Sequence, residues 1–304
     1  QALYPTELRE QPGHYNARSY TCVYKLMRSL RPLIPAVLLV VVPLLLYVHS
    51  LGNAFVIWDD NILIYKNPLV KQFSLFTIRA IFTRYDPELY IPLTLFTYQI
   101  EHLLFGLHPL AYHITNLALH CANGVMIYFL LQRWKITRAV AWVAALIFAI
   151  HPMNSEAVAW VSARKDTLSS FFFLATLLQW ERFRASAHIQ HYRKSIIFFL
   201  LGLLSKVSIA LLPIILIAMD WRDGRTLDRK SFMEKWPHFL LSGIFIVIAI
   251  FGKTRNIVSV SLWETVLLAT KATAFSLMTY ALPFRLSSIY HQNSPIALLA
   301  PDFL

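Results

Sequence analysis

Repeated apolar runs are the feature that most restricts what this chain can fold into. Pro32 to Leu51 is long enough to cross a bilayer as a helix, and Tyr112 to Leu131 and Pro237 to Gly252 are similar. Of the 304 residues, 57% are hydrophobic and only 14% are charged, which is more apolar sequence than a soluble core of this size needs. The pattern therefore predicts an all-α protein, a polytopic transmembrane helical bundle spanning residues 32–304.

The remaining apolar runs bring the predicted number of spans to about seven or eight. They are Ala139 to Ile150, Thr167 to Trp180, Ser195 to Leu204, Val207 to Met219 and Leu262 to Leu282. The last of them either crosses the membrane or lies at the outer surface as an amphipathic helix. Residues 52–111 then form a long, structured first outer loop, in which two helical patterns are expected to lie at the membrane interface.

Positive charges fall in bands between the apolar runs, and these bands predict the orientation. Lys25, Arg28 and Arg31 precede the first span and place an N-terminal arm, residues 1–31, in the cytoplasm by the positive-inside rule. Continued along the chain, this topology puts most lysines and arginines on the cytoplasmic side. The net charge of +12 then requires only anionic lipid as a partner and no nucleic acid. We find no 34-residue helical repeat and expect no repeat domain in these residues.

A dense polar segment, HPMNSEAVAWVSARKD from His151 to Asp166, separates two of the apolar runs. Ionisable residues in or beside hydrocarbon are costly, so they indicate a functional site unless they are ordinary interfacial anchors. Both interpretations stay open for Arg164 and Lys165. If Ala157 to Ala163 forms a short helix, Glu156 lies at its start and the two basic residues lie near its end, which suits the helix dipole.

Two adjacent acids, Asp59 and Asp60, follow the first span. Neighbouring carboxylates at the start of an outer loop offer a general base for an acceptor hydroxyl, or oxygen ligands for a divalent cation. A helix cap or a turn explains the same residue types. The acids and the nearby histidines permit a divalent cation but do not demand one, and no metal site is assigned.

The span from Tyr112 to Leu131 carries polar side chains at helical spacing. His113, Asn116, His120 and Asn123 recur three or four residues apart, so they share one inward face of the helix. Histidines in such a place could bind a metal, but no HExxH or similar ligand spacing occurs. Hydrogen bonding between helices is the favoured interpretation.

The order of these motifs resembles one known family. WDD is followed by LFGLHPLAYHITNLALH, by HPMNSEAVAWVSARKD and by LLSK with LLPIILIAMDW, and a weaker match reappears at LPFRLSSIYH. This order is similar to the membrane portion of the TMTC-type protein O-mannosyltransferase relatives, whose bacterial counterparts are associated with tetratricopeptide repeats. The resemblance implies a glycosyltransferase of the GT-C class, which uses polyprenyl or dolichyl phosphate sugars.

The resemblance also assigns roles to individual residues. By matching position, we expect Asp59, Asp60 and Glu156 as catalytic acids and Arg164, Lys165 and Lys206 as the cations that hold the donor phosphate. We also expect five supporting residues, His151, His113, Asn116, Asp166 and Tyr290. Transfer from a phosphate needs a base beside the acceptor hydroxyl and positive charge beside the leaving group. The predicted topology places both sets of residues on the same outer side.

The predicted function is transfer of a sugar from a polyprenyl (dolichyl or undecaprenyl) phosphate to a protein or glycan hydroxyl. The reaction is expected at the periplasmic or lumenal face of a bacterial inner membrane or of the endoplasmic reticulum. The alternative is a catalytically inert subunit of the same fold that stabilises a larger membrane complex. A transporter is disfavoured, because no repeat of broken helices related by internal symmetry is visible.

Overall fold

The computed structural model of this chain describes residues 33–85, 89–226, 228–253, 261–284 and 286–287. By its contacts the chain divides into two units, Gln1–Leu38 and Leu39–Leu304. The described part of the first unit is the beginning of one helix, and the candidate site belongs to the second. The predicted arm at residues 1–31 and the predicted supporting residue Tyr290 lie outside the described residues.

Every regular element among the described residues is helical, which confirms the all-α prediction. The α-helices are α2 (Leu33–Tyr47), α3 (Pro68–Lys71), α4 (Leu75–Thr83), α5 (Pro92–Phe105), α6 (Pro109–Arg133), α7 (Arg138–Ile150), α8 (Ser155–Ala159), α9 (Arg164–Ser186), α10 (Ile189–Ser205), α11 (Leu212–Arg222), α12 (Arg229–Lys253) and α13 (Leu262–Ala281). Short 3₁₀ or π segments join some of them at η1 (Val48–Gly52), η2 (Asn61–Tyr65), η3 (Pro152–Asn154), η4 (Val161–Ala163) and η5 (Val207–Leu211).

Within the described residues, three helical segments are long and apolar enough to cross a membrane: Leu33–Gly52, Pro109–Arg133 and Arg229–Gly252. Helix α7 is shorter but also apolar. Large apolar side chains such as Trp236 and Leu240 lie exposed along α12, a surface that suits lipid better than water. These features fit a membrane protein, as the apolar runs predict.

The other predicted spans fold as helices that are shorter or more polar. Helix α11 has 11 residues, too few to cross about 30 Å of hydrocarbon at about 1.5 Å per residue. Helix α9 has 23 residues, but it begins with the charged residues Arg164, Lys165 and Asp166. The total of seven or eight spans therefore stays a prediction.

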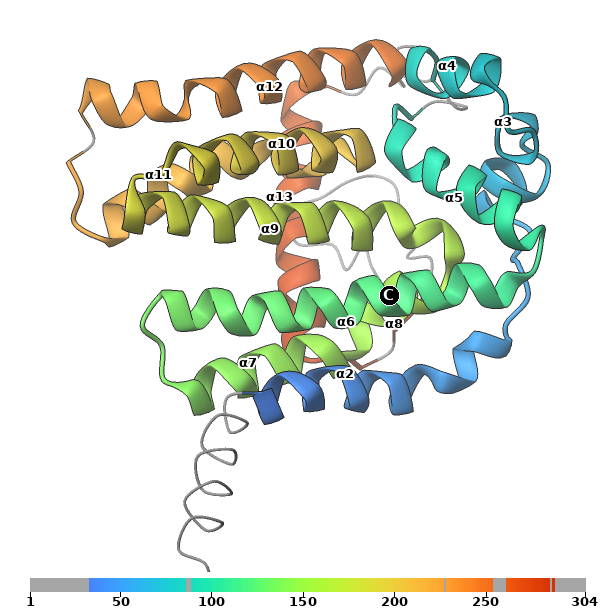
Figure 1. The fold of residues 1–304 in the computed structure, drawn as a ribbon, viewed down its shortest axis with the longest axis horizontal. Helices are drawn as coiled ribbons and strands as arrows, with labels where there is room; N and C mark the ends of the chain where they lie inside the picture. Colours follow the sequence, from blue (N-terminus) through green and yellow to red (C-terminus); the bar gives the residue numbers. More distant parts are fainter. Residues whose placement is uncertain (1–32, 86–88, 227, 254–260, 285, 288–304) are drawn as a thin grey trace, which may run out of the picture. The chain divides into compact units, whose positions relative to one another are not determined.

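Helix α9 packs along both α6 and α10, and α6 also packs on α7 (Figure 1). A core cluster joins α9, α10 and α11 through buried side chains that include Trp180, Phe199 and Leu216. The approach of α9 to α10 favours Gly202, because a Cβ at that position would lie 3.2 Å from the Cβ of Phe172. This packing fixes α9 as the support for the charged residues at both of its ends.

The segment between α2 and α6 has a core of its own. Its helices include α4, whose N-terminus is closed by a capping box between Ser74 and Thr77. Ile64, Tyr98 and Val161 lie in one buried cluster, so this segment packs directly against residues from the polar 151–166 stretch. The two stretches that carry the predicted acids and bases are therefore neighbours in space.

The prediction of one short helix from Ala157 to Ala163 is wrong. Helix α8 stops before Trp160, which is extended at φ −99° and ψ 121°, and η4 follows it. Arg164 is consequently the first residue of α9 and not the last part of a preceding helix. The helix dipole opposes positive charge at that end, and the acidic residues Asp166, in the same turn, and Glu101, in contact with Arg164, offset it.

Candidate active site

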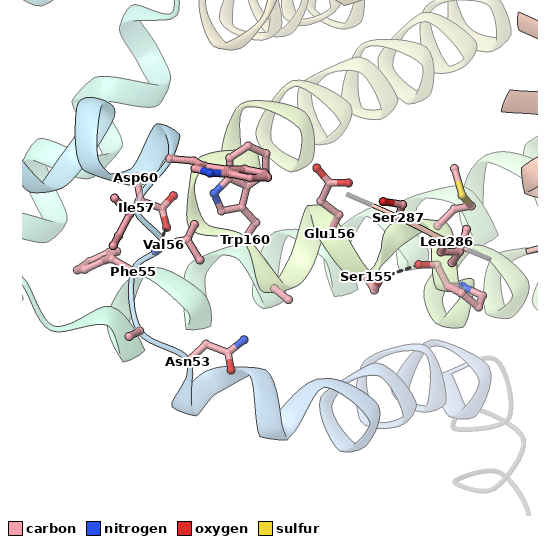
Figure 2. A pocket seen from close by; sticks show the side chains of 15 residues that line it. Asn53, Phe55, Val56, Ile57, Asp60, Ser155, Glu156, Trp160, Leu286 and Ser287 are labelled. Atoms are coloured by element: carbon pink, nitrogen blue, oxygen red, sulfur yellow. Dashed lines mark hydrogen bonds between the residues drawn. The ribbon is translucent and has the colours of Figure 1, made fainter. Parts of the chain in front are cut away.

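The larger of two cavities beside the polar segment has a volume of about 1010 Å³. It is lined by residues 53–58, by Asp60, by Glu156 and Trp160, and by residues 286–287 (Figure 2). Figure 2 shows the Glu156 side chain extending from α8 into this space. Glu156 is exposed, and no hydrogen bond or ion pair joins its carboxylate to the other described residues. The larger cavity therefore holds a carboxylate without a partner among the described residues, which suits it to accept a proton, or a hydrogen bond from a hydroxyl group.

The smaller cavity has a volume of about 210 Å³ and contains two cations, Lys165 and Lys206. Its other walls are largely apolar and include Ile91, Phe245 and Ile248. Ile248 also lines a groove of about 520 Å³ formed by apolar side chains along α12. Two ammonium groups in an apolar cavity that adjoins an apolar groove form a site suited to an anionic head with a hydrocarbon tail.

Asp59 forms an ion pair with Lys165, which lines the smaller cavity. The Lys165 Nζ donates to Asp59 Oδ2 at 2.9 Å, and the Asp59 side chain is 43% exposed. The same Nζ lies 5.5 Å from the centre of the Trp160 ring. Trp160 lines the larger cavity and Lys165 lines the smaller one, so this contact links a residue of one cavity to a residue of the other.

Lys206 forms a matching pair with Asp166. Lys206 follows α10 in an extended conformation, and its Nζ contacts Asp166 Oδ1 in the first turn of α9. The Asp166 side chain is also 43% exposed. Each lysine of the smaller cavity is thus neutralised by one half-exposed carboxylate.

Asp60 differs from its neighbour because it is buried and held by several donors. Its Oδ1 accepts hydrogen bonds from the backbone N–H of Ser162, at 2.9 Å, and from the Ser162 hydroxyl, at 2.5 Å. Its Oδ2 accepts from the backbone N–H of Val56 at 3.0 Å. These bonds fasten the first loop to the polar segment. Ser162 is absent from the residues selected on sequence, since nothing in its local pattern indicates a partner 102 positions away.

Arg164 is fully buried and lines neither cavity. Its Nε donates to Asn116 Oδ1 at 2.8 Å, its Nη1 to Glu101 Oε2 at 2.5 Å and its Nη2 to the carbonyl of Tyr112 at 2.7 Å. The guanidinium also lies 4.7 Å from the centre of the Tyr98 ring. The structure therefore separates Arg164 from Lys165 and Lys206, with which sequence reasoning had grouped it.

Glu101 is the partner that the sequence does not reveal, because it lies 63 positions before Arg164 in α5. Burial raises the pKa of Glu101 above its usual value of 4.5, and the Arg164 guanidinium opposes that rise. Asn116 completes this buried cluster by donating to the carbonyl of Trp160 at 2.9 Å. The cluster stabilises the extended break at Trp160, after which Lys165 and Asp166 follow in the first turn of α9.

The two predicted supporting histidines lie apart from the lysine cavity. The His151 Nε2 lies 2.9 Å from the carbonyl of Tyr280, and its ring stacks on the Tyr280 ring at 4.2 Å and 11°. This contact joins the polar segment to α13. His113 is buried in α6, and its ring nitrogens have no hydrogen-bond partner among the described residues. Neither histidine lines either cavity.

No group of three or more His, Cys, Asp or Glu side chains that could hold a metal ion comes together in the part of the chain that the structure describes. The acids that the sequence offers as cation ligands contact other groups, Asp59 contacting Lys165 and Asp60 contacting Ser162. The arrangement is thus built from carboxylates and ammonium groups.

The chain is similar in sequence to several curated proteins. Protein O-mannosyl-transferase TMTC3 of Mus musculus is 39% identical over 93 residues, which are 31% of this chain and 10% of that protein. Protein O-mannosyl-transferase TMTC1 of Homo sapiens is 31% identical over 164 residues, 51% of this chain and 18% of that protein. The chain is a relative of the TMTC-type protein O-mannosyl-transferases.

This relationship confirms the resemblance that the motifs indicate. Protein O-mannosyl-transferase F38B6.6 of Caenorhabditis elegans adds a longer match, 29% identical over 191 residues, 60% of this chain and 26% of that protein. The chain thus spans between 10% and 26% of the length of these relatives. No family model and no solved structure matches it.

Proposed function

We propose that this chain is the membrane portion of a glycosyltransferase that moves a sugar from a polyprenyl phosphate donor to a protein hydroxyl on the extracytoplasmic side. The observation that carries the proposal is that Lys165, one of two lysines that line the smaller cavity, lies over the ring of Trp160, which lines the larger cavity together with Glu156. The names of the relatives, protein O-mannosyl-transferases, favour mannose as the sugar and a protein as the acceptor.

The smaller cavity is the proposed donor site. A sugar linked to a lipid through phosphate is a diester with one negative charge, and the lipid phosphate left after transfer carries close to two at neutral pH, since its second pKa is about 6. Lys165 and Lys206 supply positive charge both for the charge already present and for the charge that develops on the leaving phosphate. The apolar groove along α12 receives the lipid chain.

The larger cavity is the proposed acceptor site. The acceptor oxygen forms a bond to the anomeric carbon, the bond from that carbon to the phosphate oxygen breaks, and its electron pair leaves with the phosphate. We assign the acceptor proton to Glu156, because its carboxylate has no partner among the described residues, while three donors already occupy Asp60. Asp60 is a positioning residue that holds the first loop, and Asp59 is the partner of Lys165.

Arg164, Asn116 and His151 are proposed as positioning residues, because each holds the polar segment to another element. The proposal also includes a GT-C-type bundle of about seven or eight spans, with both cavities at the periplasmic or lumenal face. The basic side chains Arg184 and Arg222 support this orientation, because they lie at the opposite end of α9 from the two lysines.

Transfer of labelled mannose from dolichyl phosphate mannose into protein, in membranes that contain the full chain, tests the proposal. Glu156→Gln is expected to lower the rate by about 100-fold or more, since loss of a general base typically costs 10²- to 10⁴-fold. Asp223→Asn is the matched control, because Asp223 is a partly exposed acid at the other end of α9 and should leave the rate unchanged.

Wild-type chain that inserts in the membrane but transfers no sugar under these conditions would contradict the proposal. That result would favour the inert subunit, for which the same ion pairs serve only to hold the loops in place. A rate that falls equally in Glu156→Gln and Asp223→Asn would also contradict the assignment of Glu156, since it would indicate a general effect on folding.

A further inference from the structure

We propose that Asp59 and Asp166 are exchangeable counter-ions of the donor cavity, an inference that rests on the function proposed above. They neutralise Lys165 and Lys206 while the cavity is empty, and one of them gives up its lysine to the phosphate of the incoming donor. After transfer they compete with the lipid phosphate product for the same ammonium groups and so promote its release.

The number of contacts distinguishes these two carboxylates from the others nearby. Asp59 and Asp166 each contact a single lysine among the described residues, and both side chains are 43% exposed. Asp60, one position further along, is buried and accepts three hydrogen bonds. A half-exposed carboxylate with one partner can rotate into water at small cost, whereas a buried carboxylate with three donors cannot.

The charge in the cavity gives the exchange its direction. Two ammonium groups and two carboxylates leave the empty cavity neutral. A donor diester brings one negative charge, so displacement of one carboxylate keeps the cavity neutral. The product monoester brings close to two negative charges. Without competing carboxylates it would therefore bind both lysines more tightly than the donor does. Return of Asp59 and Asp166 to their lysines restores the neutral empty cavity and opposes that trapping.

This role predicts the opposite sign of effect from a purely structural role. If the two acids only hold the lysines in place, their removal should loosen the cavity and weaken anion binding. If they compete with the anion, their removal should strengthen it. A half-exposed pair contributes up to about a fivefold change in affinity, so Asp59→Asn and Asp166→Asn should each bind a lipid phosphate roughly fivefold more tightly.

Equilibrium binding of farnesyl phosphate to the full chain, in nanodiscs of neutral phosphatidylcholine, measures the effect. Farnesol is the uncharged probe, and its affinity should be the same in the wild type and in both Asn variants. Lys206→Met should bind farnesyl phosphate more weakly than the wild type. Asp223→Asn removes a carboxylate of similar exposure from an arginine cluster elsewhere and should leave both affinities unchanged.

Tighter binding of farnesyl phosphate in the two Asn variants, with farnesol unchanged, supports the exchange. Equal or weaker binding in both variants overturns it and leaves the proposed donor site standing, provided that the wild type prefers farnesyl phosphate to farnesol. A wild type without that preference overturns both the exchange and the donor site. If the Asn variants bind farnesyl phosphate more tightly but the wild type transfers no sugar, the exchange is supported and only the proposed transfer reaction is contradicted.

Discussion

The ion pairs at the two ends of α9 differ in burial and in number of partners. At the end of α9, Asp220 and Lys235 are fully buried, and Asp220 also contacts Arg184 at 3.2 Å. At its start, Lys165 and Lys206 each contact one half-exposed carboxylate and line a cavity. From this difference we infer that the buried charges hold the fold, and we propose that the half-exposed charges meet the substrate. Buried charge with several partners is fixed, and half-exposed charge with one partner can exchange.

The cluster around Asp220 shows how completely a buried charge can be surrounded. Its Oδ2 accepts from the Ser231 hydroxyl at 2.8 Å and contacts Lys235, whose Nζ lies 5.4 Å from the centre of the Trp180 ring. Asp220 belongs to the LLPIILIAMDW motif, so this motif serves the packing of α9, α11 and α12 and not the cavities.

The pair of Arg164 and Glu101 belongs to the buried kind, although it lies beside the candidate active site. Position near the cavities therefore does not decide the role of a charge. Burial and the number of partners decide it, and each can be tested by substitution.

The largest expected effect is that of Arg164→Met. Glu101 would remain buried without its cation, and breaking a buried pair on one side typically costs about 3–5 kcal/mol of unfolding free energy. Burial already raises the pKa of Glu101, and the charge of Arg164 lowers it, so the loss of Arg164 should raise this pKa further. Since the pKa in the folded variant then lies above the unfolded value of 4.5, the loss should be larger at about pH 8 than at about pH 5. Denaturant titration in detergent at both values measures it.

The control is the double variant Arg164→Met with Glu101→Leu, which replaces both charges by apolar groups of similar size. It should recover more than half of the lost free energy, since a buried pair can be replaced by packed apolar residues at little cost. A double variant as unstable as Arg164→Met would show that Arg164 acts through Asn116 and Tyr112 and not through Glu101.

The helices could be predicted from sequence better than the contacts of the site. The apolar runs from Tyr112 to Leu131 and from Pro237 to Gly252 fall within α6 and α12, because long apolar periodic runs have few alternatives to a helix. Asp59 and Lys165, chosen for their chemistry, lie 2.9 Å apart although 106 positions separate them. The order of the motifs predicted that both residues belong to one site, but it did not predict that they contact each other.

The role of Arg164 could not be predicted from its neighbours in sequence. It depends on the extended residue Trp160, because the break there lets a new helix, α9, begin at Arg164. It depends also on Glu101, which contacts Arg164 from α5. The run AVAWVSA has no glycine or proline to mark such a break. Tertiary hydrogen bonds to Asn116 and Asp60 stabilise the break, and a local pattern does not contain them.

A smaller loss is expected for Lys235→Met, which tests whether several partners share the stabilisation of one charge. Asp220 would keep Arg184 and the Ser231 hydroxyl, so its carboxylate would not be left alone. We expect the unfolding free energy to fall by about 2 kcal/mol. This is closer to the contribution of one charged hydrogen bond than to the cost of breaking an isolated buried ion pair. The same denaturant titration measures it. A loss as large as that of Arg164→Met would mean that Lys235 alone neutralises Asp220.

The smallest effect on stability is expected for Lys206→Met, and it is the most informative for the comparison. Lys206 and Asp166 are both partly exposed, and exposed pairs contribute about 0–1 kcal/mol, so the unfolding free energy should change by less than about 1 kcal/mol. If the half-exposed pairs are there to meet an anion, the same variant should nevertheless lose most of its transfer rate. A stability loss comparable to that of Lys235→Met would show that the Lys206 pair holds α9 to α10, and the distinction between fixed and exchangeable charge would then fail at the site where it matters most.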